Sequence, residues 1–305
     1  MKNRTFLLVF VLFFVLFAQL AAAQSENEIR LLVRTDDVGS FTAANHASID
    51  AIKNGIARAP QVMVPCSWFP EAAKLLNENP DIEVGIHLVL TSEWINCKWR
   101  PLTQAPSITD EDGYFYSYTW TGWSGDYSEN SSLKEAKWKL SEIEAEFRAQ
   151  IEMAKKWIPR ASYISDHMYC ADWNDEIREM LYRLADEYDL VSFVENKNMQ
   201  HLPAADVKSD NPDPHERRVA EFISTLDQLE PGKTYFMYMH PALDTPEMRT
   251  VYHYGYDTVA RDRSAEHKLL VDKRAADAIK QKGIKLIGYA DLIPEVKAAE
   301  VKVEK

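Results

Sequence analysis

Short apolar runs alternate with segments of helical periodicity along most of this chain, and this alternation constrains the fold more than any other feature. The apolar runs are rich in β-branched and aromatic residues and end at polar or turn residues, which is typical of strands. They lie at 29–34, 61–64, 84–90, 161–165, 190–194, 234–239 and 284–287. Because helical segments separate them, we expect the strands to pair in parallel, in a barrel or a wound sheet.

The intervening segments carry apolar residues at helical spacing, and the clearest of them is 133–157. Its apolar side chains recur every three or four residues and form one stripe that faces the core. The other predicted helices are 42–57, 71–77, 175–188, 215–229 and 264–282. Since no repeat and no long linker interrupts the pattern, we predict a single α/β domain over 24–305.

The composition is that of a globular protein and excludes some functions. Of the 305 residues, 46% are hydrophobic and 27% charged, which excludes a disordered chain. The net charge of −12 excludes a general nucleic-acid binder, because binding phosphates needs an excess of Lys and Arg. Cys66, Cys97 and Cys170 are too few for a disulfide scaffold, but they allow one disulfide whose pairing the spacing does not decide.

The first 23 residues have the layout of a secretory signal peptide. Lys2 and Arg4 form a basic start, 6–17 is an unbroken apolar run, and three alanines at 21–23 precede polar residues. The alternative is an uncleaved anchor, although 6–23 is marginal in length for a membrane span. We therefore predict a mature protein that begins near Gln24 and is exported, to the periplasm or outside the cell.

Acidic and histidine residues gather where the predicted strands end. They are Asp36 and Asp37 after the first strand, His87 in the third, Asp166 and His167 after the fourth, and His240 after the sixth. A lone histidine in a strand is most often a hydrogen-bonded core residue. Four strands that each deliver such a residue are harder to explain this way, because the carboxyl ends of parallel strands build the active sites of α/β folds.

The adjacent pair Asp36 and Asp37 is the sharpest of these signals. Two neighbouring carboxylates after an apolar strand repel each other and lose solvation unless a positive charge lies between them. A divalent metal removes that cost, and two histidines with one carboxylate form a common catalytic zinc set. The second carboxylate can then take a proton from water. Alternatively, the pair caps the following helix, and this segment alone does not decide between the two.

Four motifs occur in a fixed order along the chain. They are RTDDVGS at 34–40, VGIHLVLT at 84–91, SDH at 165–167 and HP at 240–241. Together they resemble the YdjC-like carbohydrate deacetylases, the family of chitooligosaccharide deacetylases and of hopanoid-biosynthesis deacetylases. The resemblance runs from about residue 31 to about residue 292 and extends to a C-terminal pattern that includes Arg263 and Glu266.

The resemblance implies a distorted (β/α) barrel and the metal-dependent removal of an acetyl group from an amino sugar. It implies Asp36 as the general base, and Asp37, His87 and His167 as the metal ligands. His240 would be the general acid or a stabiliser of the transition state. Zinc is the first choice of metal because of the two imidazoles, with magnesium, manganese and cobalt as alternatives.

The third motif departs from the pattern H-x-D-S-H-x-H that is usual in the family. Here Tyr163 and Tyr169 replace the flanking histidines, and the aspartate has moved by one position to Asp166, the second candidate for the general base. The usual HPG is HPA, with Ala242 in place of glycine. These departures bear on the family's usual diacetylchitobiose substrate more than on the chemistry.

The segment 92–131 interrupts the alternation, and at 40 residues it is too long for an ordinary connection. It contains eight Trp and Tyr residues, namely Trp94, Trp99, Tyr114, Tyr116, Tyr118, Trp120, Trp123 and Tyr127. Aromatic faces stack on sugar rings and their polar edges bond hydroxyls, which favours a wall for a saccharide. The alternative is that these rings pack on the barrel. We call this segment the excursion.

Two further functions compete with an exported, metal-dependent carbohydrate deacetylase. One is a metal-dependent amidase or esterase of the same fold with another acylated, non-chitin substrate; the other is a saccharide-binding protein with a degenerate site. The complete set of ligand-type residues argues against degeneracy, and a glycosidase would leave His87 and His167 without a role. The expected partner is a saccharide or another acylated small molecule, with no membrane contact after signal cleavage; a homodimer is left open.

Overall fold

The computed structural model describes residues 27–122, 125–126, 128, 131–192, 199–202 and 214–292. The predicted signal peptide at 1–23 lies outside these residues. Among the helices that are described, none is both long enough and apolar enough to cross a membrane. Cys66, Cys97 and Cys170 all carry free thiols.

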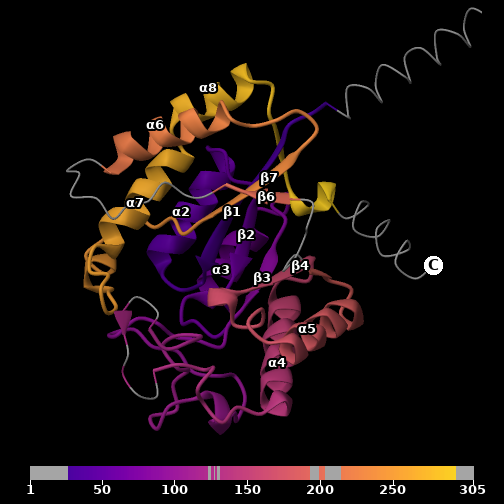
Figure 1. Ribbon diagram of the computed structural model, residues 1–305, viewed down its shortest axis with the longest axis vertical. Coiled ribbons are helices and arrows are strands. Elements are labelled where there is room, and N and C mark those ends of the chain that lie inside the picture. Colours follow the sequence, from indigo (N-terminus) through magenta and orange to yellow (C-terminus); the bar gives the residue numbers. More distant parts are fainter. Residues whose placement is uncertain are drawn as a thin grey trace, which may run out of the picture.

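Eight parallel strands of the described residues form one sheet at the centre of the molecule (Figure 1). They are β1 (Arg30–Val38), β2 (Ala59–Val62), β3 (Gly85–Leu88), β4 (Tyr163–Asp166), β5 (Val191–Ser192), β6 (Met199–His201), β7 (Thr234–Met239) and β8 (Lys285–Ile287). Seven follow the order β5-β4-β3-β2-β1-β7-β6, and β8 pairs with β1. This confirms a single α/β domain of parallel strands, consistent with a distorted barrel.

Helices cover the sheet from outside, as the alternation predicts. They are α2 (Thr42–Lys53), α3 (Phe69–Asn77), α4 (Leu140–Trp157), α5 (Asp175–Glu187), α6 (Pro214–Leu226), α7 (Val259–Leu270) and α8 (Lys273–Gln281). In Figure 1, α4 and α5 lie together on one side of the sheet, and α6, α7 and α8 lie on another. The buried stripe of α4 includes Ile143, Phe147 and Ile151, which confirms the predicted core-facing side.

The predicted helix at 133–157 begins seven residues later than its periodicity suggests. The backbone N–H groups of Leu133 and Lys134 donate to the carbonyls of Tyr118 and Thr119, at 2.9 and 2.8 Å. Since these donors pair with the excursion, the segment before Leu140 is not helical, although Leu133 itself is fully buried. The apolar spacing therefore reported burial correctly but not the backbone conformation.

The predicted helix at 264–282 is in fact two helices, and the first begins earlier than expected. α7 starts at Val259 and ends at Leu270, and α8 starts at Lys273. The side chain of Asp272 accepts a hydrogen bond from the backbone N–H of Arg274, at 2.8 Å, and so caps α8.

Strand β6 was not predicted from the sequence, because three residues are too few to show a periodicity.

Three of the six described Trp and Tyr side chains of the excursion belong to a core rather than to a wall. Trp94, Trp99 and Tyr118 are between 1 and 4% exposed. The indole N–H of Trp99 donates to the carbonyl of Thr91 at 2.7 Å, which ties the excursion to the end of β3. For these three rings the predicted saccharide wall is wrong, and packing on the barrel explains them. Trp123 and Tyr127 lie outside the described residues.

Gly85 in β3 leaves room for the ring of Tyr163 on the neighbouring strand β4. A Cβ atom added at Gly85 would lie 2.0 Å from Cε2 of that ring. The ring is held from both ends, since its hydroxyl donates to the carbonyl of Pro60 at 2.8 Å and its face packs on Tyr289. We expect Gly85→Ala to lower the free energy of unfolding by about 1–3 kcal/mol through overpacking, measured by urea denaturation.

A double-mutant cycle with Tyr163→Leu provides the control for this prediction. If the clash is the cause, the two substitutions together should destabilise the protein by less than the sum of their separate effects. Strict additivity would show that the ring moves aside and that the cost of Gly85→Ala has another origin.

Candidate metal centre

An irregularity near the end of β1 places Asp36 and Asp37 together at the carboxyl edge of the sheet. The register between β1 and β2 shifts between Thr35 and Val38, and Asp37 has a left-handed backbone with φ of 62°. In a regular strand two consecutive side chains would point to opposite faces, and a bulge changes that direction. The N-cap of α2 is Phe41, without a side-chain capping bond. The helix-cap explanation of the aspartate pair is therefore wrong.

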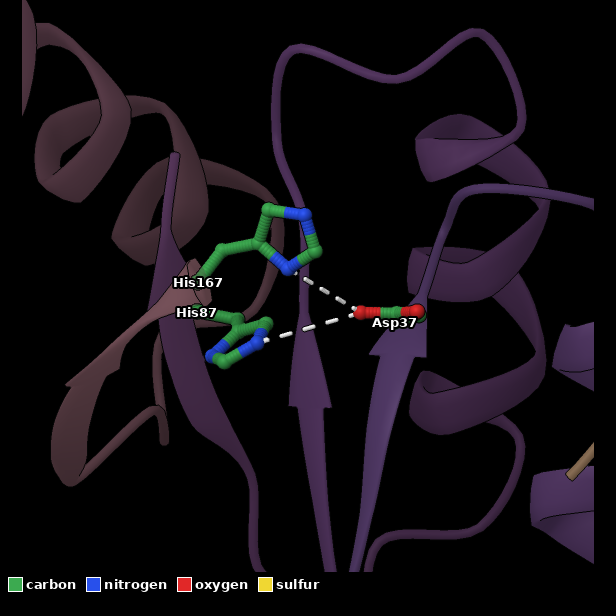
Figure 2. A group of neighbouring side chains, drawn as sticks. All are labelled: Asp37, His87 and His167. Atoms are coloured by element: carbon green, nitrogen blue, oxygen red, sulfur yellow. Dashed lines mark ion pairs between the residues drawn. The ribbon is translucent and has the colours of Figure 1, made fainter. Parts of the chain in front are cut away.

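Asp37, His87 and His167 converge on one buried point from β1, β3 and the end of β4 (Figure 2). Asp37 Oδ1 lies 3.8 Å from His87 Nε2 and 3.3 Å from His167 Nδ1. One ligand atom from each residue lies within 4.8 Å of the others. Within the described part of the chain, no hydrogen bond reaches the buried Asp37 Oδ1. An orphaned carboxylate oxygen that faces two imidazole nitrogens fits a divalent cation.

The other carboxylate oxygen of Asp37 is already occupied. Arg263 of α7 donates from Nη2 to Asp37 Oδ2 at 2.7 Å, and its guanidinium lies over the ring of Trp94. Burial by itself would raise the pKa of Asp37, but the Arg263 charge outweighs it and holds the pKa well below the ordinary value. Asp37 therefore offers the centre one oxygen as a carboxylate. Sequence reasoning noted Arg263 only as part of a C-terminal pattern.

A chain of hydrogen bonds behind His87 sets which of its nitrogens faces the centre. Its Nδ1 lies 2.8 Å from the hydroxyl of Ser165, which in turn donates to Oε1 of Gln61. Because the Ser165 proton goes to Gln61, Ser165 accepts the Nδ1 proton of His87, and Nε2 keeps its lone pair. Burial lowers the pKa of His87 to about 3, so the imidazole is neutral and ready to bind a metal.

Glu93 of the excursion plays the corresponding part behind His167. Its Oε2 lies 3.1 Å from His167 Nε2, and the residue is only 5% exposed. Burial alone would lower the pKa of His167, but Glu93 and then Asp37 outweigh it and raise the pKa to about 10. A metal must therefore displace a proton from Nδ1. Sequence reasoning missed Glu93, because nothing in an aperiodic segment shows which side chain returns to the site.

We expect Glu93→Gln to weaken zinc binding about 10- to 100-fold, because the substitution removes the charge that orients His167. Competition with a chromogenic chelator measures the dissociation constant. Glu111→Gln, an exposed glutamate of the same excursion, is the matched control and should bind zinc like the unaltered protein. Equal affinities of the two variants would show that Glu93 does not act on the metal ligand.

Asp36 does not join the three ligands and is instead held by Arg34. The guanidinium makes a bidentate pair, with Nε to Oδ1 at 2.6 Å and Nη2 to Oδ2 at 2.7 Å, and its Nη1 donates to the hydroxyl of Tyr289. Burial pushes the pKa of Asp36 upward, but Arg34 and then His87 bring it below the ordinary value. Asp36 is therefore an ionised carboxylate beside the centre. Sequence reasoning assigned no role to Arg34, although residues two apart in a strand share a face.

His240 follows β7 and lies beside both aspartates. After burial and the arginine partners, its imidazole contributes to the lowered pKa of Asp36 and of Asp37. Its backbone N–H donates to Oε2 of Glu266 at 2.6 Å, which fixes the start of the following loop. The fold thus brings all five predicted site residues to one edge.

Asp166, the second candidate for the general base, has a structural contact instead. Its carboxylate accepts a hydrogen bond from the backbone N–H of Ala171 at 2.8 Å and holds the turn after β4.

The sequence of this chain is similar to those of known proteins over most of its length. A family model described as YdjC-like protein matches residues 30–281. A carbohydrate deacetylase of Geobacillus stearothermophilus is 26% identical over 85% of this chain and 96% of its own length. One from Thermus thermophilus is 30% identical over 72% of this chain and 80% of its own length. The crystal structure of a putative cellobiose-phosphate cleavage protein of Enterococcus faecalis matches 87% of this chain and 99% of its own chain, with a TM-score of 0.67. The two sequences are 22% identical, so this likeness concerns the fold alone.

Proposed function

Because this chain belongs to the YdjC-like protein family, we propose that it is a carbohydrate deacetylase that uses a divalent metal to hydrolyse the N-acetyl group of an amino sugar. The relatives named carbohydrate deacetylase support the reaction and the class of substrate. The observation that supports a bound metal is the Oδ1 atom of Asp37, which has no hydrogen-bond partner among the described residues and faces His87 Nε2 and His167 Nδ1. Zinc suits this donor set best, with magnesium, manganese and cobalt as alternatives.

Asp36 is the base of the proposed reaction. A divalent metal bound by Asp37, His87 and His167 would supply a Lewis acid that polarises the amide carbonyl and acidifies water. Asp36 accepts the proton of the attacking water, and its low pKa keeps it ionised and able to do so. Arg34 donates to both oxygens of this carboxylate and so fixes its orientation.

His240 completes the reaction as the acid. It lies beside Asp36 at the same edge, on the loop that Glu266 fixes through the backbone. The departing amine needs a proton, and a protonated imidazole at this position can supply one. Arg263 holds the Asp37 carboxylate in place, because it donates to Oδ2 and leaves Oδ1 to face the two histidines.

Acetate release from a panel of N-acetylated mono- and oligosaccharides tests the proposed function. The zinc-loaded protein should release acetate, a chelator should abolish the release, and added zinc should restore it. Acetate from acetyl esters or acetylated peptides, with none from any saccharide, would favour the amidase or esterase alternative. Saccharide binding without any release of acetate would favour the non-enzymatic one.

We also propose that the protein is exported and that residues 1–23 are removed. The support is the order of basic, apolar and small residues in that segment. N-terminal sequencing of protein from the native host should begin near Gln24. Recovery of a chain that starts at Met1 in the membrane fraction would instead identify an uncleaved anchor.

A further inference from the structure

The segment after β8 brings a buried tyrosine to the arginine that holds the proposed base. β8 pairs in parallel with the first residues of β1, with Leu32 opposite Ile287. Because the two strands run in the same direction, the residue two positions after Ile287 comes level with Arg34, two positions after Leu32. That residue is Tyr289, which is 1% exposed, and its hydroxyl accepts a hydrogen bond from Arg34 Nη1 at 3.2 Å.

The bond from Tyr289 completes the contacts of the Arg34 guanidinium. The other two nitrogens, Nε and Nη2, donate to the carboxylate of Asp36 at 2.6 and 2.7 Å. The ring centroids of Phe236 and Tyr238 on β7 lie 5.4 and 5.5 Å from the central carbon of the guanidinium. Since the group is planar and each of its nitrogens donates to a partner, it cannot turn without breaking one of these bonds.

Tyr289 is itself fixed through both its backbone and its ring. The carboxylate of Glu83, just before β3, accepts from the backbone N–H of Tyr289 at 2.6 Å and from that of Ala290 at 2.9 Å. Gly288 permits this close approach, because a Cβ atom there would lie 2.1 Å from Oε1 of Glu83. The Tyr289 ring packs on the ring of Tyr163, with centroids 3.9 Å apart. A continuous line of contacts therefore runs from Glu83 to Asp36.

We propose that Tyr289 is a positioning residue of the reaction, which acts through Arg34 to fix the orientation of the Asp36 carboxylate. The inference rests on the proposed deacetylase function and adds a residue to its machinery. A base must lie within hydrogen-bond reach of the proton that it accepts, and a small misplacement slows the chemical step. Because Tyr289 is buried, it acts on that step through Arg34 and not by contact with the substrate.

Tyr289→Phe removes the hydroxyl and keeps the packed ring. We expect kcat for an N-acetylated saccharide to fall about 3- to 10-fold, because Arg34 loses one of its bonds and Asp36 is held less firmly. KM should stay within about twofold and the zinc content should not change, since the lost interaction acts on the chemical step alone. A lower Tm with an unaltered kcat of the folded protein would overturn the inference, because it would mean that the hydroxyl only stabilises the fold.

Tyr235→Phe is the matched control. Tyr235 on β7 is also buried, at 4% exposed, and its hydroxyl accepts from the backbone N–H of Glu230 at 2.9 Å. Its loss removes a comparable buried hydrogen bond at the amino end of β7 and should leave kcat and KM unchanged. If kcat fell equally in both variants, the loss of any buried hydroxyl in the sheet would explain the effect and the inference would fail.

Glu83→Gln tests whether the line of contacts extends to Glu83. The amide offers one acceptor oxygen to the two N–H groups that the carboxylate accepts, so Tyr289 should shift and kcat should fall about 2- to 5-fold. Because Glu83 acts through the Tyr289 hydroxyl, Glu83→Gln combined with Tyr289→Phe should lower kcat no further than Tyr289→Phe alone. Effects that multiply would refute a common line of contacts.

Crystal structures of the zinc-loaded variants separate this inference from the proposed function. In Tyr289→Phe the Arg34 guanidinium should turn and its bidentate pair with Asp36 should be lost or distorted, whereas Tyr235→Phe should keep that pair. This outcome would support the positioning role even if the protein released no acetate from any saccharide. Unchanged positions of Arg34 and Asp36 in Tyr289→Phe would refute it even if the protein proved to be an active deacetylase.

Discussion

Replacing Asp36 by asparagine is expected to lower kcat for deacetylation by about 10²–10⁴-fold, while zinc remains bound. Asparagine has nearly the same shape but cannot accept the proton of the attacking water. The three candidate ligand atoms belong to Asp37, His87 and His167, so the metal content should not change. Acetate release and elemental analysis of the same preparation measure both effects.

Two further variants keep this prediction falsifiable. Asp36→Asn leaves the buried Arg34 charge without its partner, which by itself costs about 3–5 kcal/mol of stability. Arg34→Gln combined with Asp36→Asn removes both charges, and this double variant should fold, retain zinc and still be inactive. Asp37→Asn should instead lose zinc. Full turnover in a folded Asp36→Asn protein would show that the base lies elsewhere.

Removing either imidazole of the centre should release the metal and, with it, the activity. We expect His87→Ala and His167→Ala each to weaken zinc binding by more than about 100-fold, because an outer hydrogen-bond partner alone contributes 10- to 100-fold. His46→Ala is the matched control, since His46 lies on α2 with its side chain 52% exposed. Zinc content after dialysis should fall to background in the first two variants and remain unchanged in the control.

Thermal unfolding provides a readout of these variants that does not depend on activity. A ligand that binds only the folded state raises its stability, so added zinc should raise the Tm of the unaltered protein and of His46→Ala. The same addition should leave the Tm of His87→Ala and His167→Ala nearly unchanged. Zinc content and zinc-dependent Tm that are unaltered in both histidine variants would reject these residues as ligands.

The alternation of apolar runs and helical patterns was enough to predict a parallel α/β domain, because strands separated by helices have few other ways to pair. The same reasoning predicted that Asp36, His87, His167 and His240 lie at one edge of the sheet. The start of the long helix was predicted wrongly because a long-range backbone pairing replaced the local helical preference. Leu133 lies in a helical pattern, but its N–H bonds the carbonyl of Tyr118, and the helix begins only at Leu140.

What the sequence by itself determined is therefore the set of elements and the edge at which their polar ends meet, since both follow from periodicity over a few neighbouring residues. Only the tertiary structure decided which side chains each carboxylate contacts. One oxygen of Asp37 accepts a hydrogen bond from Arg263, which is 226 positions away, and His167 is oriented by Glu93, which is 74 positions away. Local patterns do not encode such contacts, because they arise only when packing brings the strand ends, the excursion and α7 together.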